Sequence, residues 1–548
     1  MEKGIKQKYI SSAVFMLAAT ILVKVISAVY KIPLTTYIGA TGRGYFSIAY
    51  NLCLPVHALT MGAFPIALTK LVSSCNAKGN AEKIAKLWKA SKKLFFIVGI
   101  SGMVVILLCA KPYADFISSS PKSIYTIMAL APSVFFSCLA ACHRAFSEGF
   151  LDMKPTAISQ LIEAFIKLIF GLLLAKSAMS YLYDFYYING TVLGVVMDNE
   201  KQALSAIYPL TSAAAMLGTT LGSMAAYVFS KIYTCINYSK YKIKGLSYKN
   251  EYDELLRFCA PLVLATVIQS ISNFLDTSSI QYCLSLCNKE TLAEIYKMQS
   301  DDIYTYVFGI FAAALDFKNL VPAIVMALGV TAVPAVSSAF ESSAERFSKL
   351  INEIFKYTVI LGVGGGLVLS LFSNELLDLF YSKNNADIVM NAERFLFYSG
   401  VTILPCCFAV TSVYCTQALG FAKQTIVPFA IGAGVKVALN FLLVSNSEIN
   451  ILGTCVSNFF GFLVIIIANM ITIHKKTNTK FDLKSLIIKP VFVGILTYFA
   501  VDYVKTSLFL DIGKFYLLVI LLIILAVFYS ILLMIFKIIS IGEIKLLK

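Results

Sequence analysis

The feature that most constrains the fold is an internal repeat. Residues 150–175 (FLDMKPTAISQLIEAFIKLIFGLLLA) recur, roughly 269 residues later, as residues 419–444 (LGFAKQTIVPFAIGAGVKVALNFLLV). The same register lays residues 61–74 over residues 330–343. It pairs several residues without a gap: Lys154 with Lys423, Thr156 with Thr425, Lys167 with Lys436 and Pro65 with Pro334. Two matches at one register predict a duplicated unit of membrane helices, an arrangement that in transporters places the substrate site between the copies.

The composition indicates an integral membrane protein. Hydrophobic residues make up 58% of the chain and charged residues only 14%, whereas soluble domains carry more charge. A helical span needs about 20 apolar residues. Such stretches predict an all-α protein with about fourteen transmembrane helices, at 10–31, 44–71, 94–110, 123–143, 156–175, 208–230, 258–283, 304–338, 356–373, 395–418, 425–444, 449–473, 485–503 and 515–536. The first apolar stretch is too long for a signal peptide, so we expect this span to remain in the mature protein.

The distribution of basic residues predicts the orientation. If loops alternate between the two sides, one side carries about 29 Lys and Arg and the other about 12, which places both termini in the cytoplasm under the positive-inside rule. The net charge of +16 is then largely explained by topology, and nucleic acid is not expected as a partner. The cysteines mostly fall inside predicted spans and the three histidines are scattered, so no metal centre is expected.

The repeat also predicts the division of the chain. We expect a six-helix lobe at 1–236, a basic cytoplasmic linker at 237–251, a second six-helix lobe at 252–474, and an additional helix pair with a cytoplasmic tail at 485–548. Because each copy has an even number of spans, the pseudo-two-fold axis should run along the membrane normal. The segment 77–93 has Ile84, Leu87 and Trp88 at helical spacing among lysines, which suggests either a helix on the anionic inner leaflet or a solvated basic loop.

Ionisable residues inside spans are the main candidates for function, because each costs about 2.5–3.5 kcal/mol at a helix centre. Lys24, Ser27 and Lys31 are spaced to share one face of the first helix, and Arg43 begins the second. Lys24 lies deep enough to favour a cavity-facing position. Lys31 and Arg43 could equally extend to the outer interface.

The repeated lysines Lys167 and Lys436 should share one structural explanation. We expect them to extend toward the outer surface, and the alternative is that they face a central cleft. Glu163 lies one turn before Lys167, so an i,i+4 ion pair is expected, and a proton or cation site is the alternative. Its repeat counterpart is Gly432, which gives Glu163 no symmetric role.

Polar residues also interrupt the spans of the second copy. Asp276 lies in the seventh span, and Asp316, Lys318 and Asn319 lie in the eighth. Asp316 and Lys318 are two residues apart and should point to different faces, so at least one should face the cleft. Prolines and glycines, including Gly364 to Gly366, would allow these helices to bend. Catalytic signatures such as a nucleophile elbow, Walker loop or HExxH motif are absent, so we expect no enzyme activity, catalytic residue, metal ligand or cofactor.

Three stretches of the chain carry a family resemblance: VKVISAVYKIPLTTYIGATGRGYF, ALTMGAFPIALTKLVSSCNAKGN and RAFSEGFLDMKPTAISQLIEAFIKL. They resemble the multidrug/oligosaccharidyl-lipid/polysaccharide (MOP) exporter superfamily, in particular the branch of stage V sporulation protein B, YtgP and the MurJ-like flippases. The resemblance implies movement of a polyprenyl-pyrophosphate-linked glycan, such as a lipid II-like precursor, from the inner to the outer leaflet of the bacterial plasma membrane. It implies a role in peptidoglycan or polysaccharide synthesis or in sporulation.

The same resemblance suggests site residues. MurJ-like proteins use cations in a central cavity, which would correspond here to Lys24, Lys31, Arg43 and Lys318, although lysine replaces arginine at several positions. Polar residues for coupling or for the cavity would be Glu163, Asp276, Asp316 and Asn319. The final helix pair resembles the element that forms a lipid-tail groove in MurJ. Expected partners are the lipid-linked glycan, membrane lipids and cell-wall synthesis proteins.

Two alternatives stay open. The first is a multidrug exporter driven by sodium or protons, which should have a dominant acidic cavity. The second is a membrane scaffold for cell-wall synthesis that transports nothing. For a flippase, coupling to sodium, to protons or to the membrane potential is equally compatible with the sequence.

Overall fold

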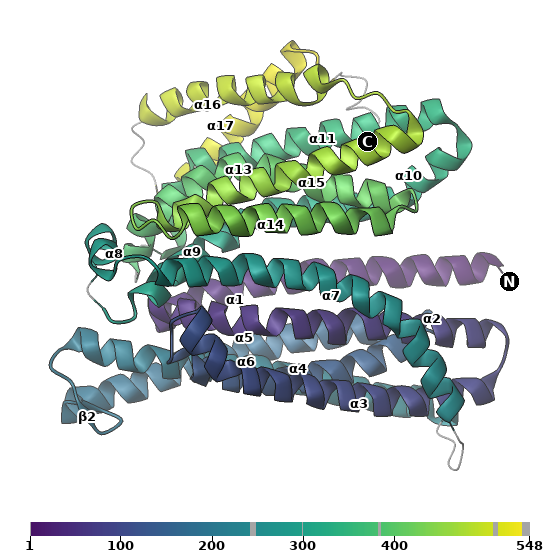
Figure 1. Ribbon diagram of the computed structural model, residues 1–548, viewed down its shortest axis with the longest axis horizontal. Coiled ribbons are helices and arrows are strands. Elements are labelled where there is room, and N and C mark those ends of the chain that lie inside the picture. The colour runs from purple at the N-terminus through teal and green to yellow at the C-terminus, as the bar shows by residue number, and fades with distance from the viewer. Residues whose placement is uncertain (1, 242–247, 299, 382–384, 508–512, 540–548) are drawn as a thin grey trace. The chain divides into compact units, whose positions relative to one another are not determined.

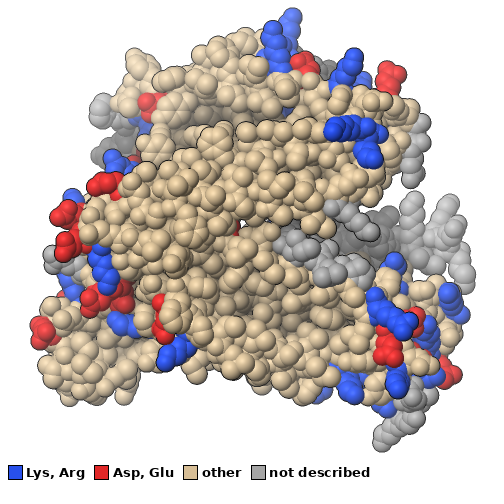
Figure 2. Space-filling model, viewed as in Figure 1, with Lys and Arg blue, Asp and Glu red and all other residues tan. Residues whose placement is uncertain are grey.

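The computed structural model describes residues 2–241, 248–298, 300–381, 385–507 and 513–539 (Figure 1). The side chains of Pro261, Pro334 and Lys423 lie outside the described part. The protein is all-α, as predicted. The strands that the structure describes are β1 (Thr191–Val192) and β2 (Val195–Val196), which form a short antiparallel hairpin. On the face shown in Figure 2, charged side chains gather mostly toward the left and right margins, and the middle is largely formed by other residues.

The chain forms two compact units. Unit 1 comprises residues 1–285 and 298–309, and unit 2 comprises residues 286–297 and 310–548. The six-helix boundaries predicted from the repeat are a different division and stay a prediction. The helices of unit 1 are α1 (Glu2–Ala58), α2 (Phe64–Ala77), α3 (Ala81–Pro112), α4 (Ser123–Glu148), α5 (Lys154–Asn189), α6 (Glu200–Asn237) and α7 (Lys249–Ser285), with short π- or 3₁₀-helical turns at Leu59–Ala63, Tyr113–Ile117 and Ser239–Tyr241.

Unit 2 contains the remaining helices. They are α8 (Lys289–Tyr296), most of α9 (Ile303–Lys318), α10 (Leu320–Ser342), α11 (Ala344–Leu371), α12 (Ser373–Tyr381), α13 (Ala386–Ala418), α14 (Ile426–Leu443), α15 (Gly453–Thr477), α16 (Lys489–Ser507) and α17 (Lys514–Ile535), with short turns at Ala422–Thr425, Asn450–Leu452 and Lys484–Ile488. Two ion pairs tie the final helix pair to α12: Lys505 with Glu375 at 2.8 Å and Lys514 with Asp378 at 2.6 Å.

Eleven described helical segments are long and apolar enough to cross a membrane, or twelve if the bent pair α9 and α10 counts as one span. One of the eleven, Ala18–Ala77, has 60 residues. At 1.5 Å per residue its helical turns add up to about 90 Å along the chain, roughly three times the hydrocarbon thickness. It therefore overlaps both of the first two predicted spans. The expected number of about fourteen stays a prediction.

The long first helix is interrupted at Gly39. This residue has φ 64° and ψ −177°, in a region of backbone space that only glycine enters at low cost. A side chain at this position would also meet the ring of Tyr208, whose nearest atoms lie 3.0 Å from the added carbon. The break falls in the glycine-containing connection predicted between the first two spans.

The helix predicted for segment 77–93 is present, but its predicted position on the inner leaflet is wrong, and the loop interpretation is wrong. The segment is a turn followed by the start of α3, and Ile84, Leu87 and Trp88 are buried inside unit 1 instead of lying on lipid. Trp88 stacks on Phe146 of α4 with ring centroids 4.1 Å apart. The lysines follow the opposite face of α3. An amphipathic pattern flanked by lysines cannot distinguish a lipid surface from a neighbouring helix, because both are apolar.

The repeat is visible inside each unit as the same helix crossing. In unit 1, Gly222 of α6 faces α5 so closely that a Cβ there would lie 2.7 Å from the Glu163 carbonyl oxygen and 3.5 Å from the Lys167 Cβ. In unit 2, a Cβ on Gly461 of α15 would lie 3.0 Å from the carbonyl oxygen of Gly432 and 2.3 Å from the Lys436 Cγ. Both crossings use the residue pair that the sequence repeat aligns.

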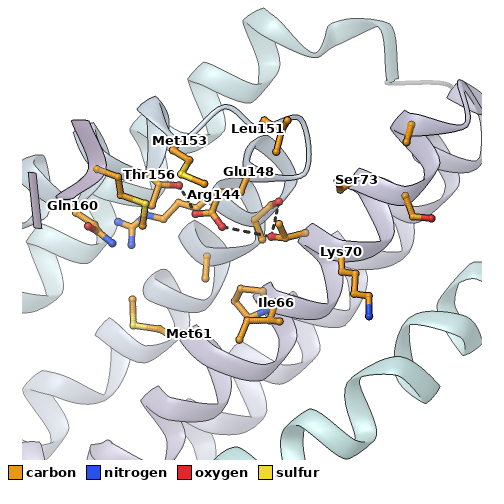
Figure 3. A pocket seen from close by; sticks show the side chains of 17 residues that line it. Met61, Ile66, Lys70, Ser73, Arg144, Glu148, Leu151, Met153, Thr156 and Gln160 are labelled. Carbon is orange, nitrogen blue, oxygen red and sulfur yellow. Dashed lines mark hydrogen bonds between the residues drawn. The ribbon is translucent and has the colours of Figure 1, made fainter. Parts of the chain in front are cut away.

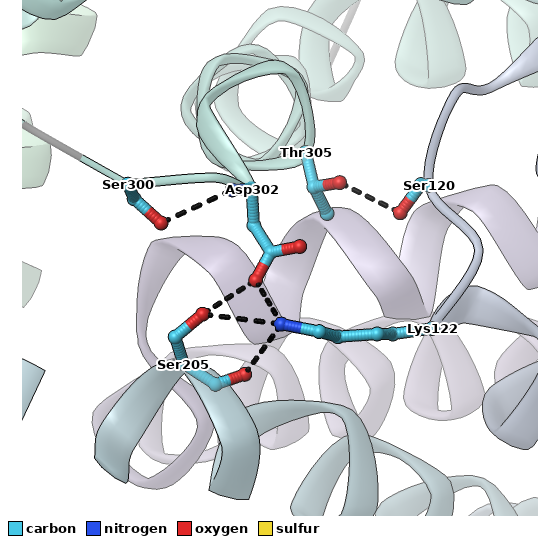
Figure 4. Close-up of polar contacts among 6 residues, drawn as sticks. All are labelled: Ser120, Lys122, Ser205, Ser300, Asp302 and Thr305. Carbon is cyan, nitrogen blue, oxygen red and sulfur yellow. Dashed lines mark hydrogen bonds and ion pairs between the residues drawn. The ribbon is translucent and has the colours of Figure 1, made fainter. Parts of the chain in front are cut away.

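The first turns of α9 are anchored in unit 1 (Figure 4). Asp302, just before α9, accepts hydrogen bonds at its Oδ2 from Lys122 Nζ at 2.7 Å and from Ser205 Oγ at 2.5 Å. The hydroxyls of Thr305 and Ser120 are 2.7 Å apart. Asp302 thus joins the loop before α4, the start of α6 and the start of α9.

Candidate functional site

The four predicted cavity cations occupy different environments. Arg43 on α1 and Lys318 on α9 are buried, with 2% and 5% of their surfaces exposed. Lys31 is half-buried and Lys24 is exposed. Charged residues retained inside membrane helices usually mark substrate or ion pathways. Arg43 and Lys318 are therefore the strongest candidates of the four.

Aromatic rings of α1 connect Arg43 with Lys167. The rings of Tyr30 and Phe46 have centroids 6.3 Å apart, and those of Phe46 and Tyr50 have centroids 5.0 Å apart. The Arg43 guanidinium lies 5.4 Å from the Phe46 ring centroid. The Lys167 ammonium lies 5.2 Å and 5.0 Å from the rings of Tyr30 and Tyr50. This cation–aromatic cluster stabilises positive charge inside an otherwise apolar bundle.

Lys167 does not extend to the outer surface. Its Nζ donates a 2.6 Å hydrogen bond to the Tyr50 hydroxyl, whose oxygen lies 3.3 Å from that of Thr219 on α6. The expected extension of Lys167 to the outer interface is therefore wrong, because the Tyr50 hydroxyl of α1 binds its ammonium between the helices of unit 1. Lys436, its repeat counterpart, lies with its ammonium 3.9 Å from the Phe462 ring centroid.

Glu163 forms an ion pair, but with a different residue from the one predicted. Its Oε2 accepts a 3.0 Å hydrogen bond from Arg144 Nη2 of α4. Its Oε1 accepts one from Ser223 Oγ of α6 at 3.2 Å, and Ser137 Oγ donates in turn to Ser223 at 3.0 Å. The expected pair with Lys167 is wrong because Arg144 offers a charged partner across the helix interface.

In unit 2, the predicted eighth span is broken. The sequence predicts one span at 304–338, whereas α9 and α10 meet at Asn319 with a bend of 42°. Lys318 ends α9, and its ammonium lies 5.8 Å from the Phe395 ring centroid. Discontinuous membrane helices often carry transporter binding sites.

The remaining predicted polar residues lie on α7, on α9 and at the bend between α9 and α10. Asp276 on α7 and Asp316 on α9 are half-buried, and Asn319 is exposed at the bend. Asp316 lies in unit 2 and Asp276 in unit 1. Their predicted coupling role stays a prediction. Among the described residues, no group of three or more His, Cys, Asp or Glu side chains could hold a metal ion.

Comparisons with known proteins agree with this architecture. Residues 10–197 match a family model described as polysaccharide biosynthesis protein. The chain is 24% identical over 490 residues to the lipid II flippase MurJ of Bacillus subtilis (strain 168), covering 87% of this chain and 84% of that protein. It is 21% identical over 480 residues to stage V sporulation protein B of the same organism, covering 86% and 84%.

Solved structures decide the fold. The lipid II flippase MurJ in an inward closed conformation superposes with a TM-score of 0.69, at 12% identity, over 95% of this chain and 98% of that one. An inward-facing multidrug resistance MATE family transporter of the MOP superfamily gives 0.64, at 12% identity, over 85% and 99%. The chain has the fold of the MOP-superfamily transporters. The predicted resemblance is confirmed, and the protein is a multi-pass membrane protein.

Three residues of the polar interior of unit 1 were not predicted from the sequence: Arg144, Tyr30 and Tyr50. Arg144 falls just beyond the predicted span 123–143, yet it lies buried in the last turns of α4. Tyr30 and Tyr50 were not considered, because tyrosine is common in membrane helices and carries no charge. The sequence feature that could have indicated these partners is Lys167 itself, because a lysine inside a membrane span needs a nearby hydrogen-bond acceptor or aromatic ring.

Proposed function

We propose that this protein is a flippase that moves a polyprenyl-pyrophosphate-linked glycan from the inner to the outer leaflet of the bacterial plasma membrane. The observation that carries the proposal is the burial of Arg43 and Lys318 in membrane helices. A pyrophosphate carries about two negative charges, which fixed cations in a dry site would strongly favour. In this proposal Lys24, Lys31, Arg43 and Lys318 bind the pyrophosphate, and Lys167 adds to their field.

The similarity to a protein named lipid II flippase supports this choice of substrate class. A groove of unit 2 supports it independently. Its volume is about 440 Å³, and it lies between α11, α13 and α16. Four of the residues that line this groove are glycines: Gly362, Gly366, Gly400 and Gly494. The other lining residues are almost all apolar. The final helix pair thus contributes to a surface suited to an isoprenoid tail, as its resemblance to the MurJ element implies.

The membrane potential could bias the direction of transport. Moving one negative charge outward through an inside-negative potential gains roughly 2.3 kcal/mol per 100 mV, provided that the protein cations stay in place. Transport then needs no resident cofactor, although sodium or proton coupling is compatible with it. The lobes would alternate access about an axis along the membrane normal, with both termini in the cytoplasm.

The multidrug-exporter alternative is less well supported by the interior of unit 1. That alternative needs an acid available to a cationic drug or coupling ion, whereas Glu163 is held by Arg144 and Ser223. The scaffold alternative differs from both in predicting no substrate binding.

Complementation of a flippase-depleted bacterial strain tests the proposal. Alanine at Lys24, Arg43 and Lys318 together should abolish growth rescue. A matched triple variant with alanine at the exposed residues Lys78, Lys201 and Lys475 should rescue as well as the wild type. Rescue by the first variant at normal expression would contradict the cationic site.

A further inference from the structure

Unit 1 contains a cavity that the proposed pyrophosphate site does not use (Figure 3). It has a volume of about 830 Å³ and lies between α1, α2, α4 and α5. Small-molecule sites typically occupy about 300–1,000 Å³. A cavity of this size can hold a group as large as one or two sugars, which is more than a pyrophosphate needs.

One wall of the cavity carries a guanidinium held in a fixed orientation. Arg144 is 5% exposed. Its Nε donates to Ser159 Oγ at 2.7 Å and its Nη2 donates to Glu163 at 3.0 Å, so α5 holds two sides of the group. Among the described residues, nothing accepts a hydrogen bond from Nη1. Arg144 therefore lines the cavity with a donor group already oriented.

The cavity's one lining carboxylate is also held in place. Glu148 accepts a 2.6 Å hydrogen bond from Thr156 at Oε1 and a 3.5 Å one from Thr69 at Oε2. Lys70 lies at the rim and points away from Glu148 in Figure 3, with its ammonium 4.8 Å from the Phe258 ring. The interior thus presents one positive group, Arg144, and one negative group, Glu148. Because the carboxylate would repel a dianion such as pyrophosphate, the cavity suits a neutral polar ligand better.

The rest of the lining suits a glycan. Hydroxyls and an amide converge from α2 and α5, and apolar side chains fill the space between them: Thr69, Ser73, Ser74, Thr156 and Gln160 are polar, and Met61, Pro65, Ile66, Leu151 and Met153 are apolar. Neutral donors and acceptors can match sugar hydroxyls and acetamido groups, and apolar side chains can pack against the C–H faces of a sugar ring.

The charged residues of this cavity are confined to the first copy of the repeat. In the register of the repeat, Lys70 corresponds to Ala339 and Gln160 to Phe429. The stretch of α13 that corresponds to Arg144 and Glu148, residues 413–419 (VYCTQAL), has no Asp, Glu, Lys, Arg or His. The shared helical scaffold therefore does not require these charges, and the chemistry of this cavity is specific to the first copy.

We infer that this cavity of unit 1 binds the hydrophilic glycan head group of the lipid-linked substrate, separately from the pyrophosphate cations. The inference rests on the proposed function. The cavity lies next to the turns at residues 78–80 and 149–153, at the end of unit 1 that the basic loops predict to be cytoplasmic. A precursor assembled in the cytoplasm would reach it from that side.

Binding measurements on the full-length protein in nanodiscs test this inference. The probes are a polyprenyl-pyrophosphate disaccharide-pentapeptide and the same polyprenyl pyrophosphate without glycan. Two variants perturb the cavity, Gln160→Leu by removing an amide and Ser73→Phe by filling space. Gln417→Leu is the matched control, because Gln417 is exposed in the corresponding turn of α13. Thermal unfolding of each variant identifies any that fail to fold, and Gln160→Leu is nearly isosteric.

We expect both cavity variants to weaken binding of the glycan-bearing probe at least tenfold while leaving the glycan-free probe and the control unchanged. Equal loss for both probes, or no loss for either, would overturn the cavity assignment. The assignment would also be overturned if the cavity variants changed the binding of anionic phospholipid and left the binding of the glycan-bearing probe unchanged. If the wild type binds neither probe, the proposed function itself fails, which distinguishes the two failures.

Discussion

Arg144 Nη2 lies 3.0 Å from Glu163 Oε2, and this ion pair joins α4 to α5 inside unit 1. Arg144 is almost completely buried and Glu163 is partly exposed. Removing one partner of a buried pair leaves an uncompensated charge, which costs up to about 3–5 kcal/mol, whereas replacing both partners with apolar groups is often tolerated. The pair therefore constrains how each residue can be changed.

We expect Glu163→Leu to lower the thermal unfolding temperature strongly, because it leaves the Arg144 guanidinium without its carboxylate. The double variant Arg144→Met with Glu163→Leu should recover part of that loss. Thermal unfolding in detergent, followed by intrinsic fluorescence, measures both. A double variant less stable than either single variant would show that the two side chains do not act as a pair.

The equivalent glycines at the two helix crossings should respond alike. Gly222→Ala and Gly461→Ala each place a Cβ within 3.0 Å of the facing helix, so each should lower the unfolding temperature. Gly434→Ala is the control, because a Cβ there meets nothing within 4 Å and alanine favours a helix by about 0.5–1 kcal/mol. Destabilisation by Gly434→Ala, or stabilisation at either crossing, would contradict the described packing.

Trp88→Ala should reduce the free energy of unfolding by about 3–5 kcal/mol, as expected for removing a large aromatic side chain from a core. Trp88 is 4% exposed and stacks on Phe146. Phe116→Ala, at a side chain that is 75% exposed, should have a much smaller effect in the same unfolding assay. Similar effects of the two substitutions would restore the interpretation that Trp88 lies on lipid.

The orientation of the chain can be tested by cysteine labelling in intact cells. Asp198→Cys introduces a thiol beside the β1–β2 hairpin, and Lys78→Cys introduces one in the turn between α2 and α3, both at exposed positions. A membrane-impermeant maleimide should label the Asp198→Cys variant directly and the Lys78→Cys variant only after permeabilisation. The unsubstituted protein supplies the baseline from its exposed Cys109. The reverse pattern would place both termini outside.

The sequence was sufficient for the fold class and the repeat, because length, hydropathy and aligned lysines depend on local composition. The break at Gly39 was also accessible, since glycines cluster there. The partners of Glu163 and Lys167 were not, because hydrogen bonds from Arg144 and Tyr50 join residues of different helices. The burial of Trp88 was equally inaccessible, since an apolar helix face reads the same whether it meets lipid or protein.

The burial of two candidate residues was predictable for a physical reason. Arg43 and Lys318 were candidates because a charge inside or at the edge of a predicted span has few structural roles, and both are buried. Lys24 had the same sequence signal and is exposed. The bend at Asn319 was missed, since the stretch from 304 to 338 has enough apolar residues to read as one helix.

The central claim is that buried cations of this protein carry a polyprenyl-pyrophosphate glycan across the membrane. Its most direct test is translocation of such a glycan by the purified protein in liposomes, with and without an inside-negative potential. We predict outward movement that the potential accelerates and that alanine at Lys24, Arg43 and Lys318 abolishes. The claim would be contradicted if the triple variant moved the glycan lipid at the same rate as the wild type. It would also be contradicted if the wild-type protein neither bound nor moved the glycan lipid.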